Sequence, residues 1–219
     1  MTGLLYFLSE WASPGPRRSI GTPHQLTFNN PATELTHLIE ADRAPVYMSA
    51  NPYNEKGEIH AIDRLFFDFD NEKRVRDAYC DAVQLNHHLA EYYNSGALTT
   101  YSGSKGYHIY VFLEQPVEGT EVELKALYGE LQRMITAGDK YRTLDPAVIG
   151  DVKRLCRVPY SKHQKTGELC VPVTIDHVPE PYKLPQGFTE ILRSHGLSTN
   201  LVELARRNLA RQTQTPTTL

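Results

Sequence analysis

The sequence predicts a mixed α/β fold of the α+β kind, in which an antiparallel sheet carries flanking helices. Three observations predict it. Segments typical of strands and helices follow one another in the order β-α-β-β-α-β between residues 60 and 175. Apolar residues recur at helical spacing in the two intervening segments. A tight glycine loop, SGSKG, joins two neighbouring strands, which favours antiparallel pairing.

Two long helices are the clearest elements. One is expected over about 72–94, where the glycine of NSG supplies a stop signal. The other follows Thr120 and Glu123, which have the spacing of a capping box, and its apolar stripe runs to about residue 135. The remaining expected elements are a loop at 13–31, a short helix at 36–43, strands at 44–51, 61–70, 97–101, 107–113, 152–160 and 169–175, and a tail helix at 200–211.

Composition sets broad limits on function. The chain has 219 residues and a net charge of −3, which argues against a heavily basic nucleic-acid coat but leaves room for a local basic groove. Its three cysteines lack ligand spacing, so reduced thiols in a cytoplasmic protein are expected. No apolar run approaches the roughly 18 residues of a membrane span, and the N-terminal apolar stretch precedes its basic residues, unlike a signal peptide.

Two acids end the apolar strand AIDRLFFDFD. Alternate residues of a strand share a face, so Asp68 and Asp70 point one way and Phe67 and Phe69 the other. Neighbouring carboxylates repel unless a cation lies between them, and Mg²⁺ or Mn²⁺ suits an all-oxygen site. Solvated acids at a strand end are the simpler alternative. A sugar transferase or a phosphatase of the haloacid dehalogenase type also uses such a pair, although Glu72 fits the phosphatase pattern poorly.

The segment YSGSKGYHIY has the features of an anion-binding turn. Its two glycines permit a tight backbone with exposed N–H groups around Ser104 and Lys105. The hydroxyl of Ser102 and the imidazole of His108, which begins the next strand, lie nearby in sequence. A plain hairpin with a surface lysine is the alternative interpretation.

A third stretch is locally basic. Residues 139–165 hold seven Lys or Arg and three Asp, a local charge of +4. A wall of cationic side chains there is suited to phosphate groups. A solvated basic hairpin is the alternative. The candidate wall residues are Arg154, Arg157, Lys162, His163 and Lys165, and Asp145 or Asp151 is a candidate third carboxylate for a two-ion site.

The three motifs together resemble those of the archaeo-eukaryotic primase family, which comprises catalytic small primase subunits and primase-polymerases. The family's DxD is matched by Asp68 and Asp70, and its third motif, ending in PxSxHxxTG, is matched by Asp145 followed by KRLCRVPYSKHQKTG. Its SGxxGxH is matched by Ser102, Gly103, Gly106 and His108. The resemblance covers roughly residues 45–175 and implies a palm-like core with an RRM-like sheet.

The resemblance also implies residue roles. Asp68, Asp70 and Asp145 would be the catalytic metal carboxylates, and Asp151 would be structural. The separation of twelve residues from Asp145 identifies Arg157 as a phosphate-binding residue. Lys162 and Lys165 are secondary candidates. The implied nucleotide-binding set is Ser102, Gly103, Ser104, Lys105, His108, Arg157 and His163.

The implied activity is DNA-template-directed nucleotidyl transfer that makes primers, with two Mg²⁺ or Mn²⁺ ions. Expected partners are a single-stranded DNA template, nucleoside triphosphates and a separate primase large subunit, helicase or other replication protein, with no membrane. No zinc is expected, because Cys80, Cys156 and Cys170 lack the spacing of the zinc knuckle of cellular small subunits. A catalytic domain is expected at 1–185, and the helical tail at 186–219 is a candidate docking surface.

Two alternatives remain open. SGSKGYHIYV also resembles the second motif of the end-joining repair polymerase of bacterial ligases, whereas SKHQKTG is closer to the replicative primases. A non-catalytic module that holds nucleotide or DNA within a complex belongs to a different functional class. All the expected acids are present in this sequence, which favours an enzyme.

Overall fold

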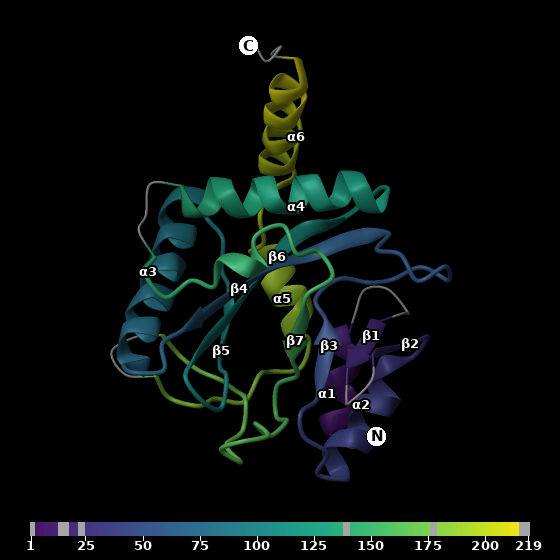
Figure 1. Cartoon of the computed structure of the whole chain (residues 1–219), viewed down its shortest axis with the longest axis vertical. Coiled ribbons are helices and arrows are strands. Elements are labelled where there is room, and N and C mark those ends of the chain that lie inside the picture. Colours follow the sequence, from purple (N-terminus) through teal and green to yellow (C-terminus); the bar gives the residue numbers. More distant parts are fainter. Residues whose placement is uncertain (1–2, 13–17, 22–24, 138–140, 176–178, 215–219) are drawn as a thin grey trace.

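The computed structural model describes residues 3–12, 18–21, 25–137, 141–175 and 179–214. Within them, helices flank two four-stranded antiparallel sheets, which confirms the expected fold class (Figure 1). The helices are α1 (Gly3–Ala12), α2 (Pro31–Glu40), α3 (Val75–Tyr93), α4 (Glu121–Thr136), the 3-10 helix η1 (Pro146–Val148), α5 (Phe188–Ser194) and α6 (Thr199–Gln214). The strands are β1 (Arg18–Gly21), β2 (Gln25–Phe28), β3 (Tyr47–Ser49), β4 (Ala61–Asp70), β5 (Leu98–Tyr101), β6 (Gly106–Glu118), β7 (Leu155–Arg157) and β8 (Val171–Pro172).

The central sheet has the strand order β4-β6-β5-β8. Strands β4 and β6 pair antiparallel in a register that sets Asp68 opposite His108 and Asp70 opposite Gly106. The tight turn between β5 and β6 matches the expected hairpin. Because β4 ends at Asp70 and β6 begins at Gly106, the acidic pair and the glycine turn meet at one end of this sheet.

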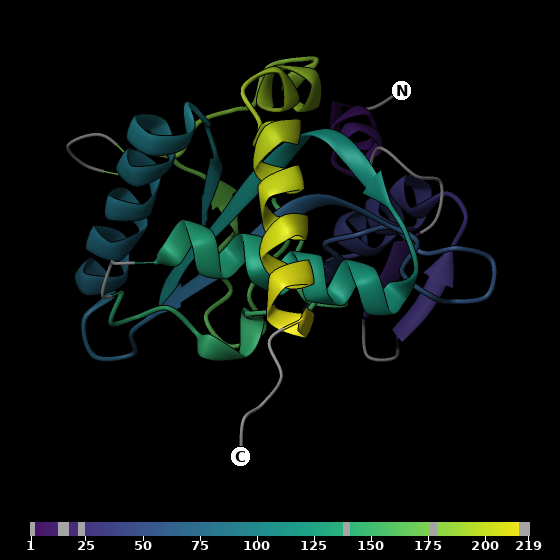
Figure 2. The same ribbon diagram turned by 90° about the horizontal axis from the view of Figure 1, so that it is seen from above.

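The alternation of side chains along β4 divides the core in two. Phe67 and Phe69 pack on one face of the central sheet with the apolar residues of α3 and α4. Phe66 packs on the other face with Trp11 of α1 and Phe188 of α5. Figures 1 and 2 show α4 crossing the sheet and α6 crossing α4 on its outer side. The acids of β4 therefore lie on the face of the sheet that α3 and α4 do not cover.

A second sheet, in the order β2-β1-β3-β7, forms the wall opposite these acids. The loop predicted at 13–31 is wrong in part, because β1 and β2 lie within it. Their four-residue segments, RSIG and QLTF, are too short to show a period amid Pro and Gly. Strand β7 pairs with β3 instead of joining the central sheet, so the strands predicted between residues 60 and 175 are shared between two sheets.

A buried charged cluster joins the two sheets. Arg18 of β1 and Arg64 of β4 each lie 2.8 Å from Oδ2 of Asp63, and all three side chains are essentially inaccessible to water. Burial lowers the pKa of Arg18 to about 10. Burial alone would raise the pKa of Asp63. The positive charges of Arg18 and Arg64 have the larger effect and hold this pKa below its ordinary value. The cluster stays charged and ties β1 to β4.

The outer edge of β4 is covered by side chains of α4. The hydroxyl of Tyr128 accepts a hydrogen bond from Phe66 N–H at 2.9 Å. The Gln132 side chain donates to the carbonyls of Phe66 and Val148, at 2.9 and 3.1 Å, and accepts from Gly150 N–H at 2.7 Å. Buried backbone groups need such partners, and an edge strand leaves a row of them. Helix α4 thus fixes both β4 and the segment that follows η1.

The predicted tail packs against the rest of the chain where the structure describes it. Leu197 exchanges backbone hydrogen bonds with β6, and Ala205 of α6 is fully buried. Asn208 donates to Glu130 of α4 at 3.2 Å. The domain boundary near residue 185 and the docking role of the tail remain predictions, and residues 215–219 of that tail lie outside the described residues.

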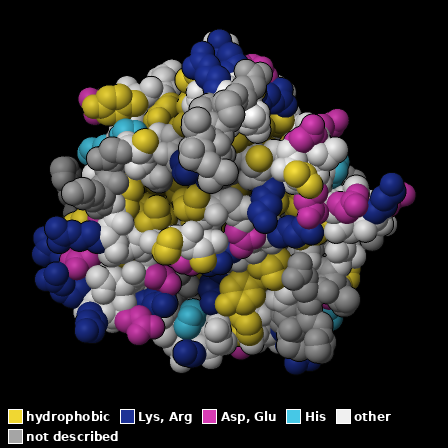
Figure 3. All heavy atoms as spheres, turned by 45° about the horizontal axis from the view of Figure 1, so that its top comes forward, with side chains coloured by type: hydrophobic (Ala, Val, Ile, Leu, Met, Phe, Trp, Pro, Cys, Tyr) yellow, Lys and Arg dark blue, Asp and Glu magenta, His cyan; other side chains and the backbone are white. Residues whose placement is uncertain are grey.

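The surface carries mixed charge. On the face shown in Figure 3, Lys and Arg side chains are interspersed with Asp and Glu side chains and with apolar patches. This mixture accords with the small net charge of −3. In the described segments, no helix combines the length and the apolar character needed to cross a bilayer.

Replacing Gln132 by Leu should lower the free energy of unfolding by about 3 kcal/mol, because two buried backbone carbonyls and the half-buried N–H of Gly150 lose their partner. Denaturant unfolding measures this difference. Val122→Ala, at an 80% exposed position of the same helix, is the control and should change stability by less than about 0.5 kcal/mol. Equal effects of the two changes would contradict the edge-covering role of Gln132.

Candidate active site

The two acids of β4 line a pocket of about 560 Å³ between the two sheets. The Asp68 side chain is 14% exposed and the Asp70 side chain 30%. Burial raises the pKa of Asp68 from 3.8 to about 6. Burial and then the charge of Asp68 raise the pKa of Asp70. Both pKa values are raised, as expected for carboxylates that lie close together in a poorly hydrated pocket.

A distant segment brings a third acid to this pair. Asp70 N–H donates to the carbonyl of Thr143, and Asp145 N–H donates to the carbonyl of Asp68, both at 2.8 Å. Residues 143–145 thus run along the end of β4. The Asp145 side chain caps η1 by accepting from Ala147 N–H at 2.9 Å. Asp68, Asp70 and Asp145 are therefore neighbours in space, as the resemblance implies.

Sequence reasoning missed the residue that anchors this segment. The carboxylate of Asp81, on α3, accepts hydrogen bonds from both the N–H and the hydroxyl of Thr143, each at 2.8 Å. No motif marks Asp81, because its partner lies 62 residues away along the chain. It is a positioning residue for the third acid.

Arg154 lies closer to the acids than the sequence predicts. As part of the basic run it was expected to face phosphates, but its Nη2 lies 2.9 Å from Asp145 Oδ2 and 3.6 Å from Asp68 Oδ2. Asp151, the alternative third carboxylate, lies beside Arg154, 3.9 Å from its Nη1. No contact of Asp151 with the acids of β4 is present among the described residues.

The glycine turn approaches the acids from β6. Gly106 pairs with Asp70, and a Cβ at Gly106 would lie 1.9 Å from the carbonyl oxygen of Phe69, so only glycine fits. The Nζ of Lys105 lies 3.2 Å from Asp70 Oδ2. The hydroxyl of Ser102 accepts from Gly106 N–H at 3.2 Å, so part of the expected anion-binding backbone serves the turn itself.

Two members of the turn differ in their orientation. Ser104 lines the pocket beside Lys105. Gly103 has φ +82°, and its carbonyl accepts from the hydroxyl of Thr166 at 2.6 Å. Gly103 therefore joins the turn to the loop after β7 and does not itself line the pocket.

His108 lies between the acids and the opposite wall. Its side chain is 9% exposed, and burial lowers its pKa to about 4, so the imidazole is neutral at pH 7. Its Nε2 is 3.7 Å from Asp68 Oδ1, which is too long for a hydrogen bond. Both Asp68 Oδ1 and His108 Nδ1 are buried with no hydrogen-bond partner among the described residues. Unpaired buried atoms of this kind need a water molecule, an ion or a ligand as a partner.

The opposite wall comes from β7 and the loop after it. Arg157 stacks on the ring of Tyr47 with its guanidinium carbon 4.8 Å from the ring centroid, and donates to the Tyr47 hydroxyl at 2.9 Å. His163 and Lys165 also line the pocket. Lys162 turns away and pairs with Asp42 at 2.8 Å, so it is not part of this wall.

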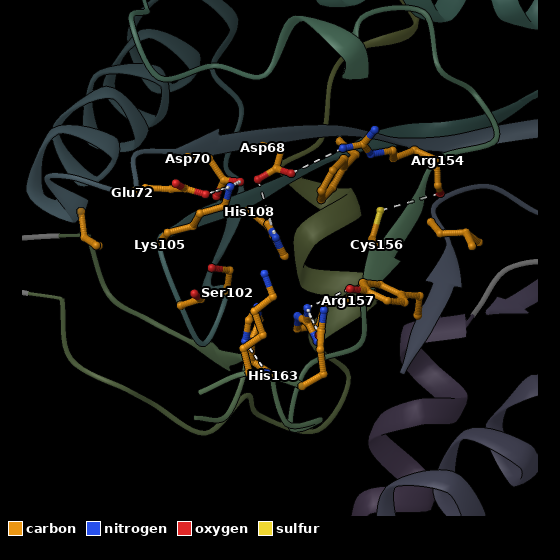
Figure 4. Close-up of a pocket in the computed structure, with 17 residues that line it drawn as sticks. Asp68, Asp70, Glu72, Ser102, Lys105, His108, Arg154, Cys156, Arg157 and His163 are labelled. Atoms are coloured by element: carbon orange, nitrogen blue, oxygen red, sulfur yellow. Dashed lines mark hydrogen bonds and ion pairs between the residues drawn. The ribbon is translucent and has the colours of Figure 1, made fainter. Parts of the chain in front are cut away.

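Figure 4 shows the pocket as a whole. Asp68 and Asp70 lie on one side with Lys105, and Arg157 and His163 lie on the other. Most of the residues predicted for the site line this one pocket, and Asp145 adjoins it through Arg154. Those that line it are Asp68, Asp70, Ser102, Ser104, Lys105, His108, Arg157 and His163.

The donor set of the acids fits a hard divalent cation. Three carboxylates with no sulfur ligand favour Mg²⁺ or Mn²⁺, and the unpaired Asp68 Oδ1 offers a ready ligand atom. Among the described residues, however, no three His, Cys, Asp or Glu side chains converge tightly enough to form a metal cage as they stand. Arg154 lies between Asp68 and Asp145 instead.

The raised pKa of Asp68 predicts how stability depends on pH. Between about pH 4 and 6 the folded protein binds a proton that the unfolded chain has released, so stability falls as pH rises through this window. With EDTA present, the free energy of unfolding should fall by up to about 3 kcal/mol more in the wild type than in Asp68→Asn. Denaturant unfolding across this pH range measures it. If the free energy of unfolding changed equally with pH in the two proteins, the raised pKa of Asp68 would be refuted.

Comparison with known proteins adds evidence on the fold. No model of a protein family matches the sequence, and no curated protein matches it. The catalytic domain of primase RepB′ in complex with initiator DNA is 14% identical, with a TM-score of 0.55 over 97% of each chain. The structure of primase RepB′ is 14% identical, with a TM-score of 0.52 over 96% of this chain and 64% of that one.

A further solved structure has a lower TM-score. The archaeo-eukaryotic primase domain of the cyanophage S-2L primase-polymerase is 16% identical, with a TM-score of 0.48 over 86% of this chain and 95% of that chain. This TM-score is too low to support an argument, so the conclusion rests on the two RepB′ structures. At these identities the similarity concerns the fold. This chain has the fold of the primase catalytic domain.

Proposed function

We propose that this chain is a member of the archaeo-eukaryotic primase family and catalyses DNA-template-directed nucleotidyl transfer to make primers. The observation that supports it is the opposition of charge across one pocket. Asp68 and Asp70 line one side of the pocket and Asp145 adjoins them at the end of β4, while Arg157, His163 and Lys165 line the far side. This is the arrangement that transfer from a metal-bound triphosphate requires.

Each side of the pocket has its own role in the proposed reaction. Asp68, Asp70 and Asp145 would hold two divalent ions, Mg²⁺ or Mn²⁺. When bound, these ions supply Lewis acidity that favours the ionised 3′-hydroxyl and neutralises phosphate charge. The 3′-hydroxyl gives its proton to solvent water, and its oxygen forms a bond to the α-phosphorus. The bond from the α-phosphorus to the oxygen that bridges to the β-phosphate breaks, so that pyrophosphate leaves.

The cationic side chains bind the triphosphate. Arg157 is held rigidly by its stacking on Tyr47, so its guanidinium loses little freedom when it pairs with phosphate. His108 is neutral at pH 7 and therefore contributes one N–H hydrogen bond instead of a charge. The triphosphate is also bound by Ser104, Lys105 and His163.

The proposed partners follow from this reaction. A single-stranded DNA template must pass the pocket, and nucleoside triphosphates must enter it. A primase large subunit, a helicase or another replication protein is the kind of separate chain with which this catalytic domain would act. The outer side of α6 is the proposed docking surface for it, because Val202 and Ala205 already pack inward.

Synthesis on unprimed single-stranded DNA with labelled ribo- or deoxynucleotides tests the proposal. The wild type should make short products with Mg²⁺ or Mn²⁺, and Asp70→Asn should reduce incorporation by at least about a thousandfold, because one ligand of the ions is lost. Glu72→Gln is the matched control, since Glu72 is 81% exposed beside the same pocket. It should stay within about threefold of the wild type.

Each other result has a defined meaning. Extension confined to ends that carry a 5′-phosphate would favour the end-joining repair polymerase. Metal-dependent nucleotide binding without turnover on any template would favour the non-catalytic module. Incorporation retained by Asp70→Asn, with circular dichroism unchanged, would refute the assignment of the acids.

Arg157→Ala should weaken nucleotide affinity about ten- to hundredfold, because a charge-assisted pair with phosphate is lost. The affinity for single-stranded DNA should change by less than about threefold. Fluorescence titrations with each ligand measure both. Lys162→Ala is the matched control, because this lysine of the loop after β7 pairs with Asp42 outside the wall. A larger loss of DNA affinity than of nucleotide affinity would contradict the role of Arg157.

A further inference from the structure

Arg154 bridges two of the three carboxylates. One nitrogen, Nη2, lies 2.9 Å from Asp145 Oδ2 and 3.6 Å from Asp68 Oδ2. The side chain is 27% exposed, so water screens these contacts only in part. A single guanidinium therefore partly neutralises both acids, and it lies where an ion shared by those acids would lie.

The backbone of Arg154 is fixed, whereas its side chain has two alternatives. Its N–H donates to the carbonyl of Asp151 at 3.1 Å, and its carbonyl accepts from Ala50 N–H at 2.9 Å. The Asp151 carboxylate, 39% exposed, lies 3.9 Å from Nη1 and offers a nearby counter-charge. Arg154 also lines the pocket in which Lys105 and Arg157 lie, so phosphates bound there offer it a second partner.

We infer that Arg154 is a displaceable internal counterion that couples ion binding to nucleotide binding. In the ion-free protein it holds Asp68 and Asp145 together. When divalent ions bind, it moves to the phosphates of the nucleotide. This inference rests on the proposed nucleotidyl transfer, because it requires ions and a triphosphate in one pocket.

The inference has a thermodynamic consequence. Ions that bind without nucleotide must displace the Arg154 guanidinium from Asp68 and Asp145. The guanidinium then keeps Asp151 as its carboxylate partner, so the ions bind weakly. A triphosphate offers Arg154 stronger partners and thereby raises the affinity for ions, and by linkage the ions raise the affinity for triphosphate. Lys105 competes with an ion at Asp70 less strongly than Arg154 does at Asp68 and Asp145. It is 42% exposed and also lies 3.4 Å from Glu72.

Direct Mn²⁺ binding tests the inference without turnover. Electron paramagnetic resonance of free Mn²⁺ measures the affinity, with and without a non-hydrolysable nucleoside triphosphate. Without nucleotide, Arg154→Gln should bind Mn²⁺ about tenfold more tightly than the wild type, because a competing cation is gone. Nucleotide should raise the wild-type affinity about tenfold and the variant's affinity by less than about threefold.

Two further variants sharpen the comparison. Lys153→Gln removes the same charge one residue away, where the amine pairs with Glu121 at 2.7 Å, and its Mn²⁺ affinity should stay within about twofold of the wild type. Arg154→Lys keeps a charge but loses the planar group that reaches both acids, so it should give an intermediate affinity. It supplies the comparison if Arg154→Gln does not fold.

Thermal unfolding gives a second readout. In EDTA, Arg154→Gln should melt below the wild type, because Asp68 and Asp145 then repel each other without a cation. Mg²⁺ should raise its melting temperature by more than that of the wild type. Equal melting temperatures in EDTA would count against the inference.

Asp68→Asn separates the two possible failures. If Asp68→Asn abolishes Mn²⁺ binding but Arg154→Gln binds Mn²⁺ like the wild type, the inference is wrong and the metal site stands. If Asp68→Asn leaves Mn²⁺ binding unchanged, the proposed metal site is wrong, and the proposed function loses its support.

Discussion

Two backbone hydrogen bonds at the end of β4 bring the third acid to the first two: Asp70 N–H donates to Thr143, and Asp145 N–H donates to the carbonyl of Asp68. An edge strand leaves such groups without partners, and residues 143–145 cover them as a short added strand would. Further along the same edge, Tyr128 and Gln132 of α4 cover the backbone of Phe66. The need to satisfy one strand edge thus also assembles the carboxylate cluster.

Assembling acids in this way has an electrostatic cost, which the neighbouring cations offset. Burial raises the pKa of Asp68 to about 6, and Arg154 and Lys105 lie among the groups whose charges oppose that rise. His108 contributes no charge at neutral pH, because burial lowers its pKa to about 4. In the proposed reaction, bound ions would relieve the remaining repulsion between the acids, and bound nucleotide would provide partners for the displaced cations. The pocket would thereby favour binding both together.

Local patterns predicted the parts of the site that lie on one strand or turn. The run AIDRLFFDFD is buried along almost all of β4, and its alternation correctly placed both acids opposite Phe67 and Phe69. The sequence also predicted the glycine turn. The structure shows why a glycine is needed there, because Gly106 has no room for a Cβ. Contacts between distant segments left no such pattern. The anchoring of Thr143 by Asp81, the proximity of Arg154 to the acids and the pairing of β7 with β3 depend on tertiary packing.

The pocket itself depends on how the two sheets meet. Its acids come from β4 of one sheet, and Arg157 comes from β7 of the other, so the width of the pocket follows from the angle and spacing between sheets. Apolar contacts alone allow sheets to slide, because they are not directional. The buried contacts of Asp63 with Arg18 and Arg64 are directional, and they join β1 to β4. A charged cluster outside the pocket thus ties the sheet that carries Arg157 to the sheet that carries the acids.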